Sequence, residues 1–442
     1  MSSRPIQRAT LLGGELFAGL ATAMIFYAEY VGLGSQLGSV WLGQGVGNLG
    51  YGNVLSFAAG VVACMLALLV PGAHVAGPRA ASVVVLMSSL LYLSSRFGLD
   101  LKAQSAAAAI ALLTAACTLL ACSGGAARGA IGSLPAALLH AFNFATAVFI
   151  VSDGVARAVI DCQQVDAVLA WTVFGGAVVF GALWSPVCEI SAAVLRRPLL
   201  ARLTPLGTMA AVALAWYVYE HSALSHGEGL ACGRFGTQAL HAGVLIQRTG
   251  SLWDALGSGL PLAVVLGAVA CGLGAGFALL LESSSAFVAS DGALLPSQSR
   301  RLRVTALANG VGACAGVGPI SYSASRTQAI RLFGGRTRLS VLMHGACLVV
   351  LALLAGPWMG HIPQFAIGVV LALVGLNMVT PGMCRMWREA YEPRAPHFLV
   401  HGVAGFWLSV VSALALGSAL AGFLTGLAAY AWWNFARSLR EG

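Results

Sequence analysis

Long apolar runs separated by short polar stretches follow one another along the whole chain. A helix needs about 20 apolar residues to cross a hydrocarbon core roughly 30 Å thick. The pattern therefore predicts an all-α membrane protein of about fourteen segments. These segments are Leu11–Leu33, Asn53–Val70, Ala80–Leu93, Ser105–Cys122, Leu134–Val151, Ala167–Ser185, Leu203–Tyr219, Leu262–Leu281, Val304–Val317, Ser325–Phe333, Leu339–Trp358, Pro363–Val379, Phe398–Leu414 and Leu416–Trp433.

Two of these segments are too short to span a bilayer as regular helices. They begin near Ala80 and Ser325, and each follows a Gly-Pro pair, Gly77-Pro78 or Gly318-Pro319. A kinked helix explains one such pair, but both pairs precede the third segment of a half. This placement predicts two inverted seven-segment repeats, about 11–220 and 261–436, in one transport domain over 1–442, with an extracytoplasmic loop at about 220–260.

Composition and charge agree with this interpretation. Hydrophobic residues make up 58% of the chain and charged residues 9%, and the mean hydropathy is +0.85, which excludes a soluble domain. The net charge of +9 does not indicate a nucleic-acid partner, because the basic residues are scattered between apolar runs. With a cytoplasmic N-terminus, the inner loops hold 17 of the 24 basic residues. We therefore expect a bacterial inner-membrane protein with both termini in the cytoplasm.

Motifs for other chemistry are missing from the sequence. The cysteines lie mostly inside apolar runs, and no Cys or His pair has the close spacing of a metal site. A metal site formed by three histidines of the outer loop stays an alternative: His221, His226 and His241. A membrane enzyme is conceivable, given the buried His140 and Glu282, but no nucleophile with a neighbouring base is recognisable in the sequence. We expect no catalytic residues, no metal and no cofactor.

Two arginines remain that no loop accounts for, Arg79 and Arg326, each at the start of a short segment. An arginine at bilayer depth is costly, so it normally faces a cavity or pairs with an anion. A helix N-terminus offers free amides and a positive dipole end, and Ser323 and Ser325 add hydroxyl donors. The arrangement predicts an anion site between two half-helices. The alternative is that one or both arginines form permanent ion pairs with Glu29 or Glu282.

The carboxylates Glu29 and Glu282 lie in the first span of each half. Burial favours the protonated form of a carboxyl group, and a nearby arginine favours the ionised form. Such a group can take up a proton when an anion occupies the site, which is the requirement for proton-coupled anion symport. For Glu282, a hydrogen bond that pins neighbouring backbone amides is an equal alternative.

The chain resembles the SulP anion permeases, the family of sulfate and bicarbonate transporters that includes prestin and pendrin. The similarity covers nearly the whole chain and is strongest after Leu262; the residues that carry it are Glu282–Asn309, Ile320–Arg326, Gly334–Arg338 and His361–Pro363, with Leu16–Leu20, Gly77-Pro78 and Leu134-Pro135 in the first half. The resemblance implies a UraA-like fold, with a mobile core, a gate, and an anion held between segments three and ten. It also implies that Ser325 and Arg326 bind the anion and that the backbone at Ala80 and Ala324 faces it. With the residues singled out above, the predicted substrate-binding set is Arg326, Ser325, Ala324, Ser323, Arg79, Ala80 and Pro78.

Four departures from the family pattern modify this expectation. Glu29 stands where many members have glutamine, a change found in relatives believed to use protons. Arg79 replaces a small or apolar residue, which would favour a divalent or carboxylate-bearing anion, or would neutralise Glu29. Ala286 lacks the hydroxyl expected of sodium-coupled members, and the chain stops at Gly442 without the cytoplasmic STAS domain.

The sequence therefore predicts a secondary active transporter of small anions that works by elevator-like alternating access, not an enzyme. Its expected partners are a small inorganic or carboxylate anion such as sulfate or bicarbonate, a proton as co-substrate, and the lipid bilayer; a homodimer is left open. An uncoupled or chloride-conducting path is the first alternative. A nucleobase or aromatic-acid permease of the same fold is the second.

Overall fold

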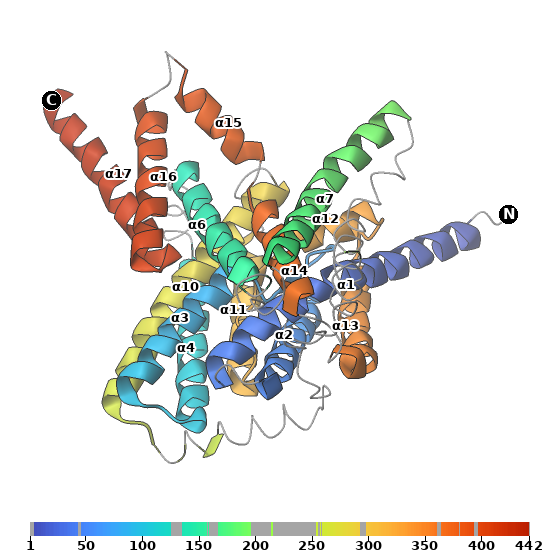
Figure 1. The fold of residues 1–442 in the computed structure, drawn as a ribbon. Helices are drawn as coiled ribbons and strands as arrows, with labels where there is room; N and C mark the ends of the chain where they lie inside the picture. The colour runs from blue at the N-terminus through green and yellow to red at the C-terminus, as the bar shows by residue number, and fades with distance from the viewer. Residues whose placement is uncertain are drawn as a thin grey trace.

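The computed structural model of the chain is almost entirely helical (Figure 1). It describes residues 4–42, 46–124, 135–156, 167–195, 259–291, 298–359, 364–379, 381–392 and 397–441, with a few isolated positions between them. Within these ranges the elements are α1 (Arg4–Leu42), α2 (Val46–Ala67), β1 (Ala76–Gly77), α3 (Ala80–Phe97), α4 (Leu101–Cys122), α6 (Ala136–Val155), α7 (Ala167–Val194), α10 (Leu262–Asp291), α11 (Gln298–Ala315), β2 (Ser321–Tyr322), α12 (Ala324–Leu332), α13 (Arg338–Met359), α14 (Gln364–Asn377), α15 (Pro381–Ala390), α16 (His397–Leu416) and α17 (Ala419–Glu441).

Several of these helices are built to cross a bilayer. Within the described ranges, five are long and apolar enough by length and composition: α3, α4, α6, α10 and α16. Shorter apolar stretches lie in α1, α2, α7 and α13. The chain is an integral, multi-pass membrane protein, as its hydropathy pattern predicts. The number of segments stays a prediction.

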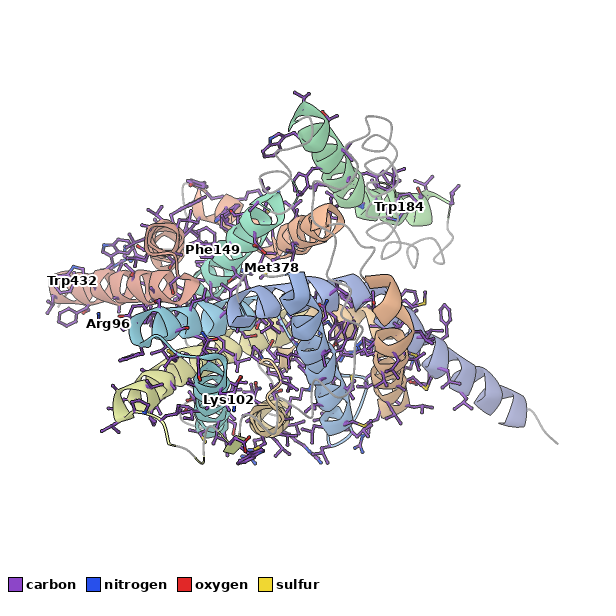
Figure 2. The ribbon with its side chains drawn as sticks, turned by 60° about the horizontal axis from the view of Figure 1, so that its bottom comes forward. Arg96, Lys102, Phe149, Trp184, Met378 and Trp432 are labelled. Carbon is purple, nitrogen blue, oxygen red and sulfur yellow. The ribbon has the colours of Figure 1, made fainter. Side chains whose placement is uncertain are left out.

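The helices form two bundles. One contains α1 to α4 with α10 to α13, and the other contains α6, α7 and α14 to α17. Apolar side chains of both bundles meet where Tyr30 and Leu33 of α1 pack with Ile150 of α6 and Leu371 of α14. Figure 2 shows Phe149 of α6 near the middle of the molecule, whereas Trp432 of α17 lies at its edge. This division confirms the predicted core and gate.

A two-stranded ribbon lies inside the first bundle. Strand β1 pairs antiparallel with β2, so that Gly77 lies opposite Ser321 and Ala76 opposite Tyr322. The side chain of Asn309 in α11 holds the segment before β2, because it accepts from the Ile320 amide at 2.9 Å and donates to the Ile320 carbonyl at 2.7 Å. Helices α3 and α12 begin directly after the two strands, so the ribbon brings their N-termini to one place.

Several elements differ from the predicted segments, and α3 and α15 are two of them. Helix α3 continues to Phe97, four residues beyond the apolar run that ends at Leu93, and stops where Gly98 adopts a left-handed conformation with φ of 59°. Helix α15 has ten residues and lies in a stretch that we predicted to be a loop. The prediction was wrong because the apolar residues of this helix occupy only one face and form no continuous apolar run.

Some predicted features lie outside the described residues. They include the segment 203–219, nearly all of the loop 220–260, and the three histidines of that loop, His221, His226 and His241.

Candidate functional site

The start of α12 fixes the position of Arg326. Ser323 is the N-cap of the helix, in an extended conformation, and its Oγ accepts from the Arg326 amide at 3.3 Å. Ala324 is the first residue of the helix and is partly buried, whereas Ser325 is exposed. Arg326 is the third residue, so its side chain leaves the first turn of the helix and enters the bundle.

Arg326 is completely buried and every guanidinium nitrogen has a partner. Its Nη2 lies 3.2 Å from Glu29 Oε2 and donates to the Pro78 carbonyl at 2.9 Å. Nε donates to the same Glu29 oxygen at 3.3 Å, and Nη1 donates to the Tyr30 hydroxyl at 3.1 Å. The guanidinium carbon also lies 4.2 Å from the centre of the Tyr30 ring. These contacts favour the alternative in which Arg326 forms a structural ion pair.

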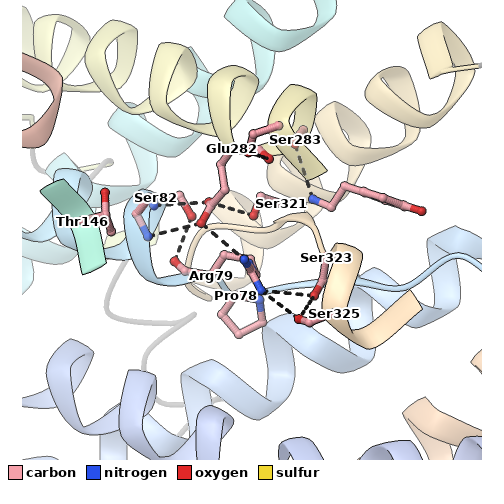
Figure 3. A network of polar contacts seen from close by, with 12 residues as sticks. Pro78, Arg79, Ser82, Thr146, Glu282, Ser283, Ser321, Ser323 and Ser325 are labelled. Carbon is pink, nitrogen blue, oxygen red and sulfur yellow. Dashed lines mark hydrogen bonds and ion pairs between the residues drawn. The ribbon is translucent and has the colours of Figure 1, made fainter. Parts of the chain in front are cut away.

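Glu282 reaches from α10 to the first turn of α3 (Figure 3). Its carboxylate accepts from the amides of Ala81 at 3.2 Å and Ser82 at 3.3 Å, and from the Ser321 hydroxyl at 2.9 Å. Helix N-termini carry unpaired amides that favour negative charge. Glu282 therefore caps α3, as in the alternative in which this carboxylate pins backbone amides, and the amides of Ala81 and Ser82 are already bonded.

Arg79 differs from Arg326 in exposure and in the length of its contacts. It is the extended residue before α3, with 17% of its side chain exposed. Nη1 donates to Ser325 Oγ at 3.1 Å and to Ser323 Oγ at 3.4 Å, which Figure 3 shows as a fan of contacts between the two half-helices. The carboxylates are further away, because Glu29 Oε1 lies 3.7 Å from Nη1 and Glu282 Oε1 lies 3.7 Å from Nε.

Four charged side chains of the site are connected by ion pairs, and we call them the charge quartet: Glu29, Arg79, Glu282 and Arg326. Arg326 contacts Glu29, and Arg79 contacts both Glu29 and Glu282. Two arginines and two ionised carboxylates sum to zero. The first-span carboxylate of each half contacts the half-helix of the other half, since Glu29 of α1 meets α12 and Glu282 of α10 meets α3.

The remaining predicted site residues, Pro78 and Ala80, contact the site through their backbone or by packing. Pro78 is buried and offers its carbonyl to Arg326, and Ala80 is buried beside Tyr30 and Phe57. The sequence interpretation missed two partners, Tyr30 and Ser321. Ser321 was recognisable, because alternate residues of an extended strand share a face and Ser321 precedes Ser323 by two. Tyr30 follows Glu29 directly, and no pattern in the sequence indicated its role.

A family comparison covers part of the second half of the chain. Residues 246–392 match the model of the sulfate permease family, a stretch that includes Glu282, Ser323, Ser325 and Arg326. The resemblance to the SulP permeases is confirmed. No curated protein sequence matches the chain.

Solved structures of the same fold cover almost the whole chain. The transmembrane domain of BicA, a cyanobacterial bicarbonate transporter, has 16% identity and a TM-score of 0.58, and covers 97% of this chain and 98% of its own. SLC26A9 has 15% identity and a TM-score of 0.59 over 94% of this chain, which spans 64% of the SLC26A9 chain. The murine SLC26A9 anion transporter in its inward-facing state gives 15% identity and a TM-score of 0.57, with 95% of this chain and 68% of its own covered. At these identities the comparison shows the SulP transmembrane fold.

Proposed function

We propose that this chain is a secondary active transporter of small anions, which bind where α3 and α12 begin. The observation that carries the proposal is the contact of the Arg79 guanidinium with the exposed Ser325 hydroxyl at 3.1 Å. A cation and a hydroxyl donor are thus presented beside the N-terminus of α12. The proposed binding set is Ser325, Ala324, Ser323, Arg79, Ala80 and Pro78; Arg326 supports this set from behind through its ion pair with Glu29 and its bond to the Pro78 carbonyl.

The two bundles support an elevator-like mechanism. All four members of the charge quartet belong to the first bundle, whereas the second contributes apolar side chains such as Ile150 and Leu371 to the contact between them. An apolar contact surface can slide without breaking ion pairs. The first bundle would then carry the anion past the second.

The comparisons support an anion as the substrate and a transporter instead of an enzyme. The matched family is that of sulfate permeases, and the similar structures include a bicarbonate transporter and an anion transporter. We propose sulfate, bicarbonate or a small carboxylate, carried with a proton for which Glu29 and Glu282 are the candidate sites. A location in the bacterial inner membrane, cytoplasmic termini and a homodimer belong to the same proposal.

The proposal is tested with purified protein in liposomes. Uptake of sulfate, bicarbonate, chloride and succinate is measured with and without a pH gradient that is acidic outside. We expect uptake of at least one oxyanion, stimulated by the gradient. An uptake rate that is the same with and without the pH gradient would favour the uncoupled path. The absence of uptake of any of the four anions would contradict the proposal.

A further inference from the structure

We infer that Arg79, and not Arg326, is the cation that the transported anion contacts, and that the capture of Arg79 by the anion transfers a proton to Glu29. The inference rests on the proposed function. It assigns separate roles to two arginines that are alike in sequence context, and it identifies the connection between substrate and proton.

Access separates the two arginines. The Arg326 side chain has no exposed surface, and its bonds to Glu29, Tyr30 and Pro78 use all three nitrogens. An anion that reached it would have to break a buried ion pair, which is strongly unfavourable. Arg79 is partly exposed and contacts the exposed Ser325. An arriving anion therefore meets Arg79 and Ser325 first.

The contacts of Arg79 with carboxylates are long enough to be exchanged. Both are 3.7 Å, beyond hydrogen-bond distance, whereas the Arg326 to Glu29 contacts are 3.2 and 3.3 Å. A substrate oxygen within 3 Å of Arg79 would form a charge-assisted hydrogen bond that neither carboxylate makes. The substrate can thus draw Arg79 away without disturbing Arg326.

Charge balance then requires a proton. The charge quartet is neutral when its four members are ionised, and one bound monovalent anion would leave a net charge of −1 in a largely buried site. Unbalanced buried charge is costly. If one carboxylate takes up one proton to become a carboxylic acid, the site is neutral again with a monovalent anion, and with a divalent anion such as sulfate its net charge falls from −2 to −1. No other co-reactant is needed.

The hydrogen bonds of the two carboxylates identify Glu29 as the acceptor. Glu282 accepts from two backbone amides, which can only donate, and from the Ser321 hydroxyl. Glu29 is different, because Oε2 receives Arg326 while Oε1 faces Arg79 at 3.7 Å. When the anion withdraws Arg79, Oε1 loses that charge and is the oxygen at which the proton adds.

Other titratable groups nearby do not replace Glu29 in this role. The charged and titratable side chains that face Glu29 and its partners come from α1, α2, the start of α3, α10, α12 and α13; they are Tyr30, Cys64, Arg79, Glu282, Arg326 and His344. Tyr30 accepts a hydrogen bond from Arg326, His344 Nε2 lies 3.5 Å from the Tyr30 hydroxyl, and Cys64 interacts with Arg326, whereas Glu29 Oε1 lies 3.7 Å from Arg79 itself. An anion at Arg79 therefore acts most directly on Glu29.

The test compares proton coupling in variants reconstituted in liposomes that contain a luminal pH dye. The probes are radiolabelled sulfate and radiolabelled succinate. The variants are Arg79→Gln, Arg79→Lys, Glu29→Gln and, as a matched control, Arg96→Gln, which removes an exposed arginine from the other end of α3. Elution volume and thermal unfolding in detergent establish that each variant is folded.

We expect the wild type and Arg96→Gln to acidify the lumen in proportion to uptake. Arg79→Gln should raise KM by about tenfold or more, the value of one charge-assisted hydrogen bond. Its residual uptake should no longer acidify the lumen, because without Arg79 the anion no longer changes the charge that faces Glu29 Oε1. Glu29→Gln should also transport without acidification, because no carboxylate remains at position 29 to take up the proton.

Arg79→Lys keeps the charge and should keep coupled uptake. The inference is overturned if folded Arg79→Gln retains the wild-type KM and acidification, or if folded Arg79→Lys has lost coupled uptake. Either result leaves the proposed function standing as long as the wild type transports. A wild type that takes up none of the four anions of the liposome panel contradicts the proposed function itself.

Discussion

Gly77 lies against the guanidinium of Arg326 so closely that a Cβ at position 77 would overlap Nη1 and would come within 2.9 Å of the Tyr30 hydroxyl oxygen. The glycine of the Gly-Pro pair therefore has a second role besides opening the backbone. It leaves the space through which Arg326 reaches Tyr30 and Glu29.

The first prediction follows from this contact. Gly77→Ala should displace the Arg326 side chain or separate β1 from β2, and should lower the stability of the protein by about 1–3 kcal/mol, the range for overpacking. Thermal unfolding in detergent measures the loss. Gly310→Ala in α11 is the control, because its added methyl group meets no atom within 4 Å. Equal stability of the two variants would contradict the prediction.

The ion pair of Arg326 and Glu29 supports a second prediction. Arg326→Ala should destabilise the fold by roughly 3–5 kcal/mol, since it leaves the buried Glu29 without its partner. Adding Glu29→Gln should recover part of that loss, because the unpaired charge is removed as well. Unfolding of both single variants and the double variant forms the cycle. Additive losses would show that the two side chains do not interact.

Glu282 permits a third prediction about the first turn of α3. Glu282→Ala should leave the amides of Ala81 and Ser82 unpaired at a cost of about 1–3 kcal/mol, and these amides should exchange hydrogen faster. Glu282→Gln keeps one acceptor oxygen and should lose less. Exposed Glu389→Ala serves as the control. Unchanged exchange at residues 81 and 82 in Glu282→Ala would exclude a capping role.

A fourth prediction concerns Asn309. Asn309→Asp keeps the shape of the side chain but cannot donate to the Ile320 carbonyl, so it should loosen the segment before β2 and destabilise the protein by about 1–3 kcal/mol. Asn434→Asp is the matched control, because that amide makes a local bond to Tyr430 within α17. A larger effect at position 434 than at position 309 would refute this role.

The sequence was sufficient for most of the helices. A transmembrane helix must place apolar residues on lipid and on its neighbours, so α4, α10, α13 and α16 begin within four residues of the predicted segments. Helix α15 was missed because a short amphipathic helix has no long apolar run. The pairing of β1 with β2 was missed as well, because two-residue strands have no detectable periodicity.

The site was predicted in composition but not in connectivity. Arg79 and Arg326 both follow a Gly-Pro pair, but one precedes its helix and the other is the third residue of its helix. A shift of one or two residues at a helix start rotates a side chain by 100 to 200° about the axis, and sequence patterns do not fix helix boundaries that finely. The sequence therefore identified the charged residues and left open which of them are sealed by partners.

The crossed contacts of Glu29 with α12 and Glu282 with α3 also bear on assembly during synthesis. Before the second half is made, Glu29 has no Arg326, the first turn of α3 has no Glu282, and β1 has no partner strand. The N-terminal half must therefore remain in the membrane without these three partners until the second half is made. Two fragments divided between residues 195 and 259 should each be degraded when made alone, and should protect each other when made together.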